Sequence, residues 1–503
     1  MKNNVTTVWW NQKPLSVAVG TTLAACLGID APCGGRGSCG KCKVIASGAL
    51  SPLSDTEKSK LTAAEIAAGM RLACRTAVLG ECPVIPFAPM GQTAVLIDGK
   101  AVEAPVSPMF SRYGAALDIG TTTLAARLYD TDGKLLAACG LPNPQGQFGA
   151  DVISRIEASL GGNAKALADL ILKAVDDMLY RLAKEAGISP AEIDGICITG
   201  NTAMLYLLTQ SDPDALSHAP FAADRLFGER ITAKSLGLHA VTEQATVLLP
   251  PCISAFVGAD TVCALLATGL CDKNESALLA DVGTNGEIAL WHNERLTVCS
   301  TAAGPAFEGA GITMGMRGAT GAIDRVQLVN GTLSAHVIGN TAPIGICGSG
   351  LVDAVACLLE LEDLDETGYM EADTLTVAAP VKLYNSDIRA LQLAKSAICA
   401  GLCTVLKQQT ATAAEIKALY IAGGFGNYLN PQNAARIGLL PRSLCHKIKA
   451  VGNAALDGAA LLLLDRSTLA KAEKLAKSAT ALELSTSPTF AELYMTGMLL
   501  KEI

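Results

Sequence analysis

Residues 116–136 read ALDIGTTTLAARLYDTDGKLL, and residues 279–296 read LADVGTNGEIALWHNERL. Each stretch contains an apolar run, an aspartate, an apolar residue, a glycine and a threonine, followed by a second apolar run. The two aspartates, Asp118 and Asp281, lie 163 positions apart. Two short apolar runs joined by a glycine-containing turn predict a β-hairpin. The repeat therefore predicts two similar α/β halves, each opening with a hairpin whose turn faces a central cleft.

The residues at both turns suit phosphate groups and a divalent cation. Gly120 and Gly283 permit a turn whose backbone N–H groups converge on an anion. Mg²⁺ prefers oxygen ligands and keeps several waters, so Asp118 and Asp281 are expected to face each other and to hold Mg²⁺ through water. One such hairpin alone would be an ordinary Asp-Gly turn, but the matched pair indicates a nucleotide site. The side chains expected to reach the nucleotide from the two turns are those of Thr121, Thr122, Thr123, Thr284 and Asn285.

Three further glycine-containing segments could also contribute to a nucleotide site. ITGNTAM (198–204) comes after a predicted strand, and GICGSGLVDAV (345–355) has a glycine-rich turn that enters an apolar helix. LYIAGGFGNYL (419–429) has paired glycines that let the backbone approach a ligand closely. With the hairpins, these segments resemble the motifs of the actin–sugar kinase–Hsp70 (ASKHA) ATPases. That resemblance implies nucleotide contacts from Gly200, Asn201, Gly304, Gly348, Ser349, Gly423, Gly424 and Asp457.

Three carboxylates outside the two turns are further candidates. Asp151 is either the N-cap of a helix, because VISRI follows it at helical spacing, or the group that orients the attacking water or the Mg²⁺ shell. Glu308, in the stretch GPAFEG, has the same open status. Asp457 is expected to support the second hairpin or the metal. The predicted catalytic set is Asp118, Asp281, Asp151 and Glu308.

The N-terminal segment contains CGGRGSCGKC at residues 33–42. Strand-like stretches are expected at 5–10, 15–19 and 43–46, and helices at 21–28 and 56–68. The cysteine spacing is C-x₅-C-x₂-C, followed after 31 residues by Cys74. A [2Fe–2S] cluster needs four thiolates, and glycines let the main chain approach such a cluster. The predicted ligands are Cys33, Cys39, Cys42 and Cys74.

Two alternatives stay open for this motif. A structural zinc ion could use the same thiols, although zinc sites usually pair their ligands as two C-x₂₋₄-C motifs and only one close pair is present here. Cys82 is a less favoured fourth ligand, since Gly80 and Pro83 suggest that it lies beyond the last loop. The order of elements resembles the β-grasp ferredoxins.

Length, charge and hydropathy exclude several classes of function, and the positions of the motifs suggest where the domains begin and end. The chain has 503 residues and a formal charge of −8, which argues against a nucleic-acid partner. The N-terminus lacks the apolar region of a signal peptide, no uncharged stretch reaches the ~18–20 apolar residues of a membrane span, and a cytoplasmic location is expected. We expect a ferredoxin-like domain at 1–84, a linker at 85–114 that could hold one short hairpin, and a two-lobed ATPase domain at 115–503 whose second hairpin begins at about 277.

Two segments narrow the family. NPQGQFGADVISRI (143–156) and AAGPAFEGAGITMGM (302–316), together with the N-terminal cysteine motif, resemble the reductive activators of corrinoid-dependent enzymes. The resemblance implies an ATP-hydrolysing electron-transfer protein of α/β and α+β multidomain fold. It implies ATP, Mg²⁺ and one [2Fe–2S] cluster as cofactors, and one-electron reduction of a Co(II) corrinoid to Co(I) as the reaction.

The expected partners are a corrinoid protein of a methyltransferase system and an unidentified low-potential electron donor, with a homodimer also compatible. Two other functions stay open. The chain could activate another low-potential enzyme, such as a radical dehydratase, or it could be a non-catalytic redox sensor gated by ATP. ATPase activity measured with and without a Co(II) corrinoid protein separates the sensor from the reductase.

Overall fold

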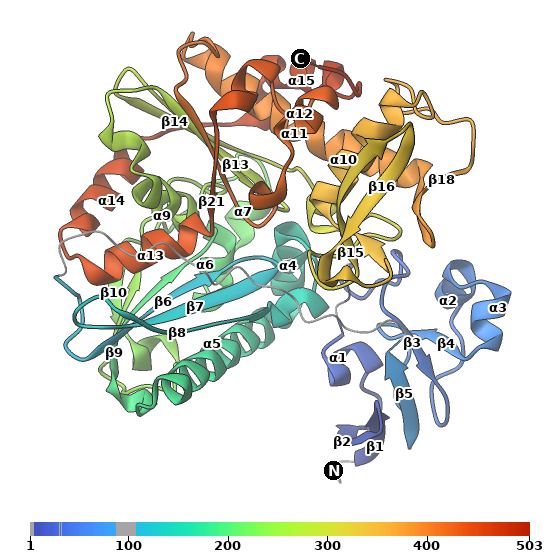
Figure 1. Ribbon diagram of the computed structural model, residues 1–503. Helices are drawn as coiled ribbons and strands as arrows, with labels where there is room; N and C mark the ends of the chain where they lie inside the picture. Colours follow the sequence, from blue (N-terminus) through green and yellow to red (C-terminus); the bar gives the residue numbers. More distant parts are fainter. Residues whose placement is uncertain (1–4, 30, 32, 87–106, 503) are drawn as a thin grey trace. The chain divides into compact units, whose positions relative to one another are not determined.

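The computed structural model describes residues 5–29, 31, 33–86 and 107–502 (Figure 1). The chain separates into two compact units. The first comprises Met1–Gln92, Pro142–Val175 and Tyr206–Phe221, and the second comprises Thr93–Leu141, Asp176–Leu205 and Ala222–Ile503. The cysteine motif lies in the first unit, and both aspartate hairpins lie in the second.

The first unit contains a mixed five-stranded sheet in the order β2-β1-β5-β3-β4. Its strands are β1 (Val5–Trp10), β2 (Lys13–Ala18), β3 (Lys43–Ala46), β4 (Met70–Leu72) and β5 (Cys82–Pro86). Helices α1 (Leu23–Leu27), α2 (Asp55–Lys60) and α3 (Ala63–Ala67) belong to the same module. The β1–β2 turn is Asn11–Gln12, both residues with positive φ, so the turn is shorter than the one implied by strands at 5–10 and 15–19. This arrangement confirms the β-grasp ferredoxin fold.

Two boundaries differ from the expectation. The helix expected over 56–68 is two helices, because Thr62 starts α3 by accepting a hydrogen bond from the amide of Glu65. The sheet also continues to Pro86 through β5, past residue 84. The short hairpin expected in the linker lies outside the described residues.

The second unit contains two six-stranded sheets that share the order of five strands and add the sixth at opposite edges. One has the order β10-β11-β9-β6-β7-β8, and the other β21-β20-β12-β13-β14-β22. The first sheet consists of β6 (Tyr113–Ile119), β7 (Thr123–Asp130), β8 (Leu135–Pro142), β9 (Ile193–Thr199), β10 (Glu229–Thr232) and β11 (Thr246–Leu249). The second consists of β12 (Ala277–Val282), β13 (Gly286–His292), β14 (Arg295–Thr301), β20 (Ala418–Ala422), β21 (Ile448–Gly452) and β22 (Thr480–Leu482).

The two sheets confirm the predicted repeat. β6 pairs antiparallel with β7 and parallel with β9, and β12 pairs antiparallel with β13 and parallel with β20. Both aspartates lie near the carboxyl end of the first strand of their hairpin. The duplicated halves therefore present equivalent strand ends.

Helices α9 (Ala259–Thr268) and α13 (Ala454–Leu464) pack against each other in the second unit (Figure 1). Their approach is close enough that a methyl group added at Gly458 would lie 1.9 Å from the carbonyl oxygen of Cys263. No side chain larger than hydrogen fits there. The helices cross at backbone contact.

The remaining helices are α4 (Val152–Ala158), α5 (Ala164–Ala186), α6 (Thr202–Thr209), α7 (Asp214–Ser217), α8 (Ala233–Leu236), α10 (Gly348–Glu360), α11 (Asn385–Gln408), α12 (Pro431–Arg436), α14 (Thr468–Ser478) and α15 (Pro488–Thr496). Two small sheets contain β15 (Ala322–Val329), β16 (Thr332–Val337) and β17 (Gly345–Ile346), and β18 (Thr374–Ala378) with β19 (Val381–Tyr384). The short 3₁₀ segments used below are η1 (Pro144–Gln147) and η5 (Pro305–Glu308).

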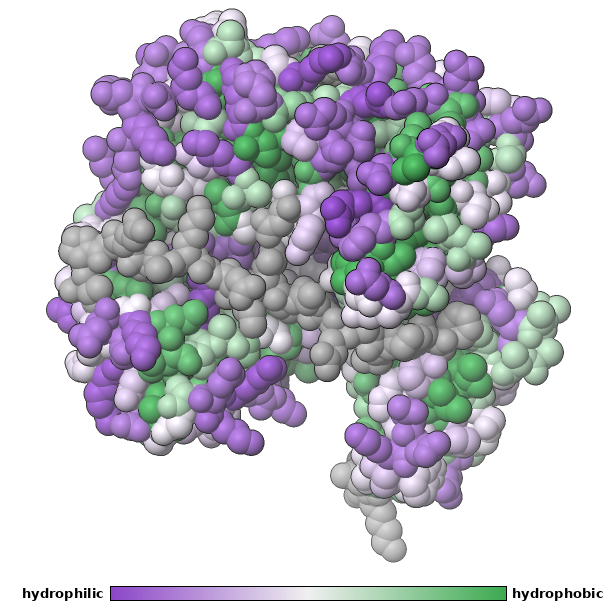
Figure 2. All heavy atoms as spheres, in the orientation of Figure 1, coloured by the Kyte–Doolittle hydropathy of each residue, from purple (hydrophilic) through white to green (hydrophobic). Residues whose placement is uncertain are grey.

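One helix has the length and apolar composition of a membrane span, although no such segment was expected from the sequence. Within the described residues, α11 alone is long and apolar enough to cross a membrane by length and composition, and 78% of its apolar window is buried. Such burial is typical of a core helix. Figure 2 shows hydrophilic residues over much of the visible face, with the apolar ones divided among separate patches.

Candidate functional site

The first hairpin places its polar groups at the end of β6. A methyl group added at Gly120 would lie 2.8 Å from the carbonyl oxygen of Thr123, so the turn requires glycine. The side-chain amide of Asn201 donates to Oγ1 of Thr121 over 3.0 Å, and Oδ1 of Asn201 accepts from the amide of Met204 over 2.9 Å. The structure thus brings together Thr121 and Asn201, two of the predicted nucleotide residues.

The second hairpin is tied differently. Oγ1 of Thr284 donates to Oε1 of Glu308 over 2.8 Å, and the amide of Gly304 donates to the carbonyl oxygen of Thr284 over 2.9 Å. The turn itself closes through the amide of Gly283 and the carbonyl oxygen of Asn285, 3.0 Å apart. The predicted catalytic Glu308 therefore lies beside the second turn.

Asp118, Asp260 and Asp281 form a carboxylate site, each half-buried with part of its surface open to solvent. Burial raises the pKa of Asp118 to about 7, and the charges of Asp260 and Asp281 add to the shift against a hydrogen bond from Asn453. Burial, with the charges of Asp260 and Glu308, raises the pKa of Asp281 to about 7. Burial also raises the pKa of Asp260 to about 6. Three like charges in one place favour a bound cation.

Glu287 adds a fourth acidic group. It lies directly opposite Asp281 in the register of β12 and β13, where like charges repel. Burial, with the charges of Asp260 and Asp281, raises its pKa well above the ordinary value. Within the described ranges, no three His, Cys, Asp or Glu side chains converge on a position for a single ion. The carboxylates therefore suit a cation held through waters.

Helix N-termini face this site. Asp260 is the second residue of α9, and its amide donates to the carbonyl oxygen of Gly200 over 3.2 Å. Asn453 is the N-cap of α13, and its side-chain amide donates to Oδ2 of Asp118 over 3.0 Å. The positive end of a helix dipole stabilises negative charge. The two helices thus offset part of the carboxylate repulsion.

Asp260, Glu287 and Asn453 were not among the residues predicted from the sequence. A signal existed for each. VGAD precedes an apolar helix, as the other glycine turns do, and Glu287 ends the motif DVGTNGE. Asn453 lies in VGNAALDGAA, from which Asp457 was chosen instead. The sequence therefore identified the correct segment, but the residue in it that contacts Asp118 is Asn453, the N-cap of α13.

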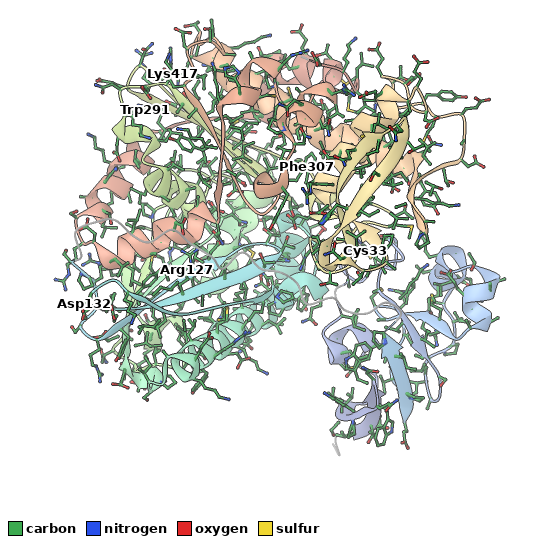
Figure 3. All side chains as sticks on the ribbon, in the orientation of Figure 1. Cys33, Arg127, Asp132, Trp291, Phe307 and Lys417 are labelled. Atoms are coloured by element: carbon green, nitrogen blue, oxygen red, sulfur yellow. The ribbon has the colours of Figure 1, made fainter. Side chains whose placement is uncertain are left out.

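The structure gives Asp457 a different neighbour from the one expected. Nη1 of Arg127, on β7 of the first hairpin, lies 2.5 Å from Oδ1 of Asp457, and Arg127 is 1% exposed (Figure 3). Because an unpaired buried guanidinium is costly, Asp457 neutralises Arg127 of the first hairpin, and its support of the second hairpin or the metal stays a prediction.

Other predicted glycines serve close packing. A methyl group added at Gly200 would lie 2.9 Å from the carbonyl oxygen of Ile119, and one at Gly423 would lie 3.1 Å from Oδ1 of Asp281. One at Gly348 would lie 2.2 Å from the carbonyl oxygen of Phe307 in η5. The hydroxyl of Ser349 donates to the carbonyl oxygen of Asp324 over 2.8 Å. Gly348 and Ser349 therefore hold α10 in place, while Gly423 borders the carboxylate site.

The remaining predicted residues of the turns and of the glycine pair have these positions. Thr122 is half-buried in the first turn, Thr123 begins β7, and Gly424 is exposed beside Gly423. Asp151, in the first unit, is the N-cap of α4: Oδ1 accepts from the amide of Ser154 over 2.8 Å and Oδ2 from its hydroxyl over 2.9 Å. Of the two roles considered for Asp151, helix N-cap or orientation of the attacking water or the Mg²⁺ shell, the structure shows the N-cap.

The four predicted cluster ligands lie as two pairs of thiols. Sγ of Cys42 lies 3.2 Å from Sγ of Cys74. The side-chain hydrogen bond from Cys74 lowers the pKa of Cys42 to about 7, and the pKa of Cys74 is raised in turn. Burial acts to raise the pKa of Cys33, but hydrogen bonds from the amide and thiol of Cys39 lower it to about 7.

This pairing suits a two-iron cluster. The amide of Gly37 donates to Sγ of Cys33 over 3.2 Å, and N–H donors to sulfur stabilise thiolates. A [2Fe–2S] cluster takes two thiolates on each iron, whereas zinc needs four ligands around one point. The paired thiols fit the former. Cys82 is fully buried in β5, and burial raises its pKa.

Glu57 fixes the loop that carries Cys74. Its Oε1 accepts from Nε of Arg71 over 2.8 Å, from the amide of Leu72 over 3.2 Å and from Oγ1 of Thr76 over 3.1 Å. Burial acts to raise the pKa of Glu57, but the hydrogen bond from Arg71 and the amide of Ser54 outweigh it and lower the pKa to about 2. A buried carboxylate thus holds both sides of one cluster ligand.

The segment 143–149 lies against the cysteine loop within the first unit. The amide of Ala31 donates to the carbonyl oxygen of Gly146 over 3.3 Å, and a methyl group added at Gly34 would lie 3.1 Å from the carbonyl oxygen of Phe148. Nε of the buried Arg155 donates to the carbonyl oxygen of Gly149 over 3.0 Å. This part of the stretch 143–156 is therefore in backbone contact with the cysteine loop.

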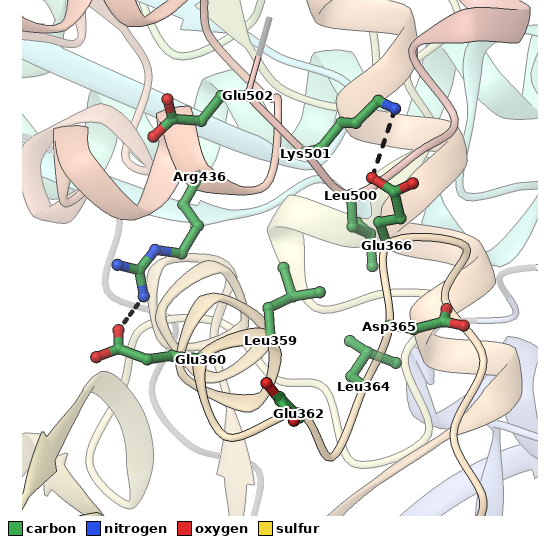
Figure 4. A pocket seen from close by; sticks show the side chains of 10 residues that line it. All are labelled: Leu359, Glu360, Glu362, Leu364, Asp365, Glu366, Arg436, Leu500, Lys501 and Glu502. Atoms are coloured by element: carbon green, nitrogen blue, oxygen red, sulfur yellow. Dashed lines mark hydrogen bonds and ion pairs between the residues drawn. The ribbon is translucent and has the colours of Figure 1, made fainter.

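A surface pocket of about 680 Å³ lies apart from these residues (Figure 4). It is lined by Leu359, Glu360, Glu362, Leu364, Asp365, Glu366, Arg436, Leu500, Lys501 and Glu502. Arg436 pairs with Glu360, and Lys501 lies 3.4 Å from Glu366. None of the predicted site residues lines it.

Comparison with known families covers most of the chain. Residues 10–79 match the 2Fe-2S iron-sulfur cluster binding domain. Residues 113–273 match the RACo middle region, and residues 275–503 match the C-terminal domain of RACo, the ASKHA domain. The matches follow the order of elements in the structure, and they confirm a ferredoxin-type domain followed by an ASKHA domain.

Two relatives and one solved structure are similar over most of their length. The corrinoid activation enzyme RamQ of Eubacterium limosum is 36% identical over 416 residues, which are 76% of this chain and 69% of the relative. The [Co(II) methylated amine-specific corrinoid protein] reductase of Methanosarcina barkeri is 26% identical over 76% of each chain. The structure of a reductive activator for corrinoid, iron-sulfur protein matches with a TM-score of 0.74 and 28% identity, over 99% of this chain and 98% of that one.

Proposed function

Because the chain belongs to the RACo family of reductive activators of corrinoid proteins, we propose that it uses ATP to return a corrinoid protein from Co(II) to Co(I). One electron passes from the iron–sulfur cluster of this chain to the cobalt of the partner. The observation that carries the proposal is the presence, in one chain, of a four-thiol ferredoxin site and a duplicated carboxylate hairpin. Relatives named for corrinoid activation and for corrinoid protein reduction support it.

Energetics explain why the two sites belong together. The potential of a plant-type [2Fe–2S] cluster is about −400 mV, and moving one electron against 100 mV costs about 2.3 kcal/mol. A Co(II) corrinoid that lies a few hundred millivolts lower cannot be reduced by such a donor alone. ATP bound by the same chain supplies the missing free energy.

The chain's own residues supply the nucleotide site. Thr121 and Asn201 of the first half, and the amides of the second turn, would bind the phosphate groups. Asp118, Asp260 and Asp281, with Glu308 nearby, would hold Mg²⁺, and Gly423 and Gly424 would border the nucleoside. When bound, Mg²⁺ offsets the negative charge that the carboxylates and phosphates concentrate there.

Coupling follows from differential affinity. ATP held between equivalent hairpins favours a closed arrangement of the two sheets of the second unit, because a ligand shifts an equilibrium only as far as it prefers one state. Closure about a hinge is a common bistable element. The closed form changes the affinity of the chain for the corrinoid protein or the coordination of its cobalt, and hydrolysis resets it.

The finer parts of the proposal concern domains, partners and location. The domains are a ferredoxin-like domain that extends to the end of β5 at Pro86, a linker, and an ATPase domain that includes β6 from Tyr113 onward. A separate low-potential protein reduces the cluster, the protein works in the cytoplasm, and light scattering would test a homodimer.

The variant Asp281→Ala tests the coupling. We expect ATP turnover to be lost while the visible absorbance of the cluster is unchanged, and ATP-dependent reduction of a Co(II) corrinoid protein to be lost with the turnover. Asp132→Asn, an exposed residue after β7, is the control and should leave both activities intact. Corrinoid reduction at full rate in Asp281→Ala would refute the coupling.

A further inference from the structure

The cysteine motif lies in a basic segment of an acidic protein. Residues 1–86 carry nine Lys and Arg against five Asp and Glu, a net charge of +4. Because the whole chain carries −8, residues 87–503 carry −12. The module that holds the redox site therefore differs in sign from the rest of the chain.

Four exposed cations surround the cluster loop, and we call them the basic rim: Arg36, Lys41, Lys60 and Arg75. Nε of Arg36 donates to the carbonyl oxygen of Cys33 over 3.0 Å. A methyl group added at Gly37 would lie 2.9 Å from Cγ of Arg75, and one at Gly40 would lie 3.6 Å from Cβ of Lys60. Lys41 stands between two ligands in the loop itself. The rim is therefore built around the cluster site.

The described carboxylates of this module have partners outside the rim. Asp55 pairs with Lys58, Glu57 with Arg71 and Glu65 with Lys43, and Glu81 accepts from Nε1 of Trp9. Arg36 lies 3.9 Å from Glu157, with both side chains more than 60% exposed. An exposed pair at that distance contributes little, so Arg36 still contributes positive potential beside the loop.

The loop is also accessible. Cys39 and the backbone at Gly34 are exposed, so an approaching protein can reach one of the four predicted ligands and part of the loop. Charged surfaces of opposite sign steer such encounters and raise association rates. We propose that the basic rim is the docking surface for the protein that reduces the cluster, and that this electron donor presents acidic side chains around a flavin or iron–sulfur centre.

The proposal rests on the proposed function, which requires an external source of electrons. One electron leaves the donor's centre, which is oxidised by one electron, and enters the cluster, which is reduced by one. No bond or proton is transferred.

The charges favour this donor over an acidic corrinoid protein. The corrinoid protein has to meet the nucleotide-binding part of the chain for ATP to act on it, and that part carries the charge of −12. An acidic surface would be repelled there. A donor that only has to reach the cluster is not so constrained.

Stopped-flow reduction of the full-length protein tests the proposal, with no ATP or corrinoid present. The probe is an acidic flavodoxin in its hydroquinone form. We expect the second-order rate to fall steeply with added salt, and Arg36→Glu with Lys60→Glu to lower it about tenfold at low ionic strength. Lys13→Glu makes a change of the same sign at β2, the edge strand of the sheet, and should lower it less than twofold.

A cationic reductant separates charge from damage. Reduced methyl viologen should react faster with the double variant than with the parent, whereas a damaged cluster would slow both reductants. The proposal fails if flavodoxin rates are insensitive to salt, or if the double variant matches Lys13→Glu. In a separate assay with ATP and a Co(II) corrinoid protein, the proposal also fails if the double variant slows only the corrinoid step and leaves flavodoxin rates unchanged, because the rim would then face the corrinoid protein. None of these outcomes bears on the Asp281→Ala test.

Discussion

The cluster site and the carboxylate site differ in how the chain assembles them. Three of the four thiols lie within ten residues, and the fourth is held by Glu57. The three carboxylates come from separate segments, with 163 positions between Asp118 and Asp281. A local site is readable from spacing alone, whereas a dispersed one depends on which strand ends the fold brings together.

The two sites also handle charge in opposite ways. The thiols receive N–H donors and stand within a basic rim. The carboxylates lie close to one another, and Asn453 and the N-termini of α9 and α13 offset part of their mutual repulsion. The first site therefore favours its anions, and the second needs a cation. If this contrast holds, variants of one site should leave the readout of the other unchanged.

The largest effect is expected at the cluster. Cys74→Ala removes one of the two thiols on one iron, and we expect complete loss of the visible absorbance of the anaerobically purified protein. ATP turnover without corrinoid protein should persist. Cys82→Ala is the matched control and should keep the absorbance. If the two results were exchanged, Cys82 would be the fourth ligand.

The next largest effect is expected at Asp260. Asp260→Asn keeps the shape but removes a charge from the site, and ATP turnover should fall at least about a hundredfold, as for removal of a group that positions protons or water. Absorbance should be unchanged. Steady-state phosphate release measures this, with Asp132→Asn as the control. Turnover within twofold of the parent would exclude Asp260 from the site.

Glu57→Gln should destabilise the ferredoxin-like module by about 3 kcal/mol, since it leaves the buried Arg71 without a charged partner. The low pKa of Glu57, about 2, gives stability that is present above its unfolded pKa near 4.5 and lost as pH falls from there towards 2. Urea titrations followed by cluster absorbance should show this loss in the parent. A variant with the parent's midpoint at pH 7 would contradict the argument. Asp55→Asn is the exposed control.

Mg²⁺ with ATP should stabilise the second unit by about 2.7 kcal/mol at a hundred times the dissociation constant. Asp118 and Asp281 have pKa values raised to about 7, so without metal the folded state binds protons that the unfolded state has released. The stability from these groups is therefore lost as pH rises from about 4 through 7. Thermal unfolding should show a larger Mg²⁺ effect at pH 8 than at pH 6. An equal effect at both would mean that the carboxylates do not meet the ion.

The smallest effect compares the two turns. Thr121→Val removes a hydroxyl tied to Asn201, and Thr284→Val removes one tied to Glu308. A neutral hydrogen bond contributes about 1 kcal/mol and one to a charged group more, so Thr121→Val should raise the KM for ATP by roughly fivefold and Thr284→Val by at least as much. Equal effects would make the turns interchangeable.

The sequence predicted the elements better than their associations. The hairpin at 116–136 corresponds to β6 and β7, and the strand at 43–46 to β3. The break between α2 and α3 was missed, because the capping side chain of Thr62 competes with a continuous helical pattern. Pairing of β14 with β22, 183 positions apart from Thr297 to Thr480, has no local signal.

The same limit applies to the sites. The cysteine ligands follow from a ten-residue motif and one distant loop, whereas Asp260 looks from sequence like an ordinary polar residue at a helix start. Asp457 and Asn453 lie four residues apart on one helix end, and only the three-dimensional position of Arg127 decides which of them faces Asp118.

The backbone contact between α9 and α13 has a mechanical consequence. With Gly458 pressed on the carbonyl of Cys263, the helices have no side-chain layer on which to slide, so they behave as one stiff lever. The N-terminal ends of the two helices, Asp260 on α9 and Asn453 on α13, both lie at the carboxylate site. A displacement of one end is therefore passed to the other, and Gly458→Ala would separate the helices without changing a residue of that site.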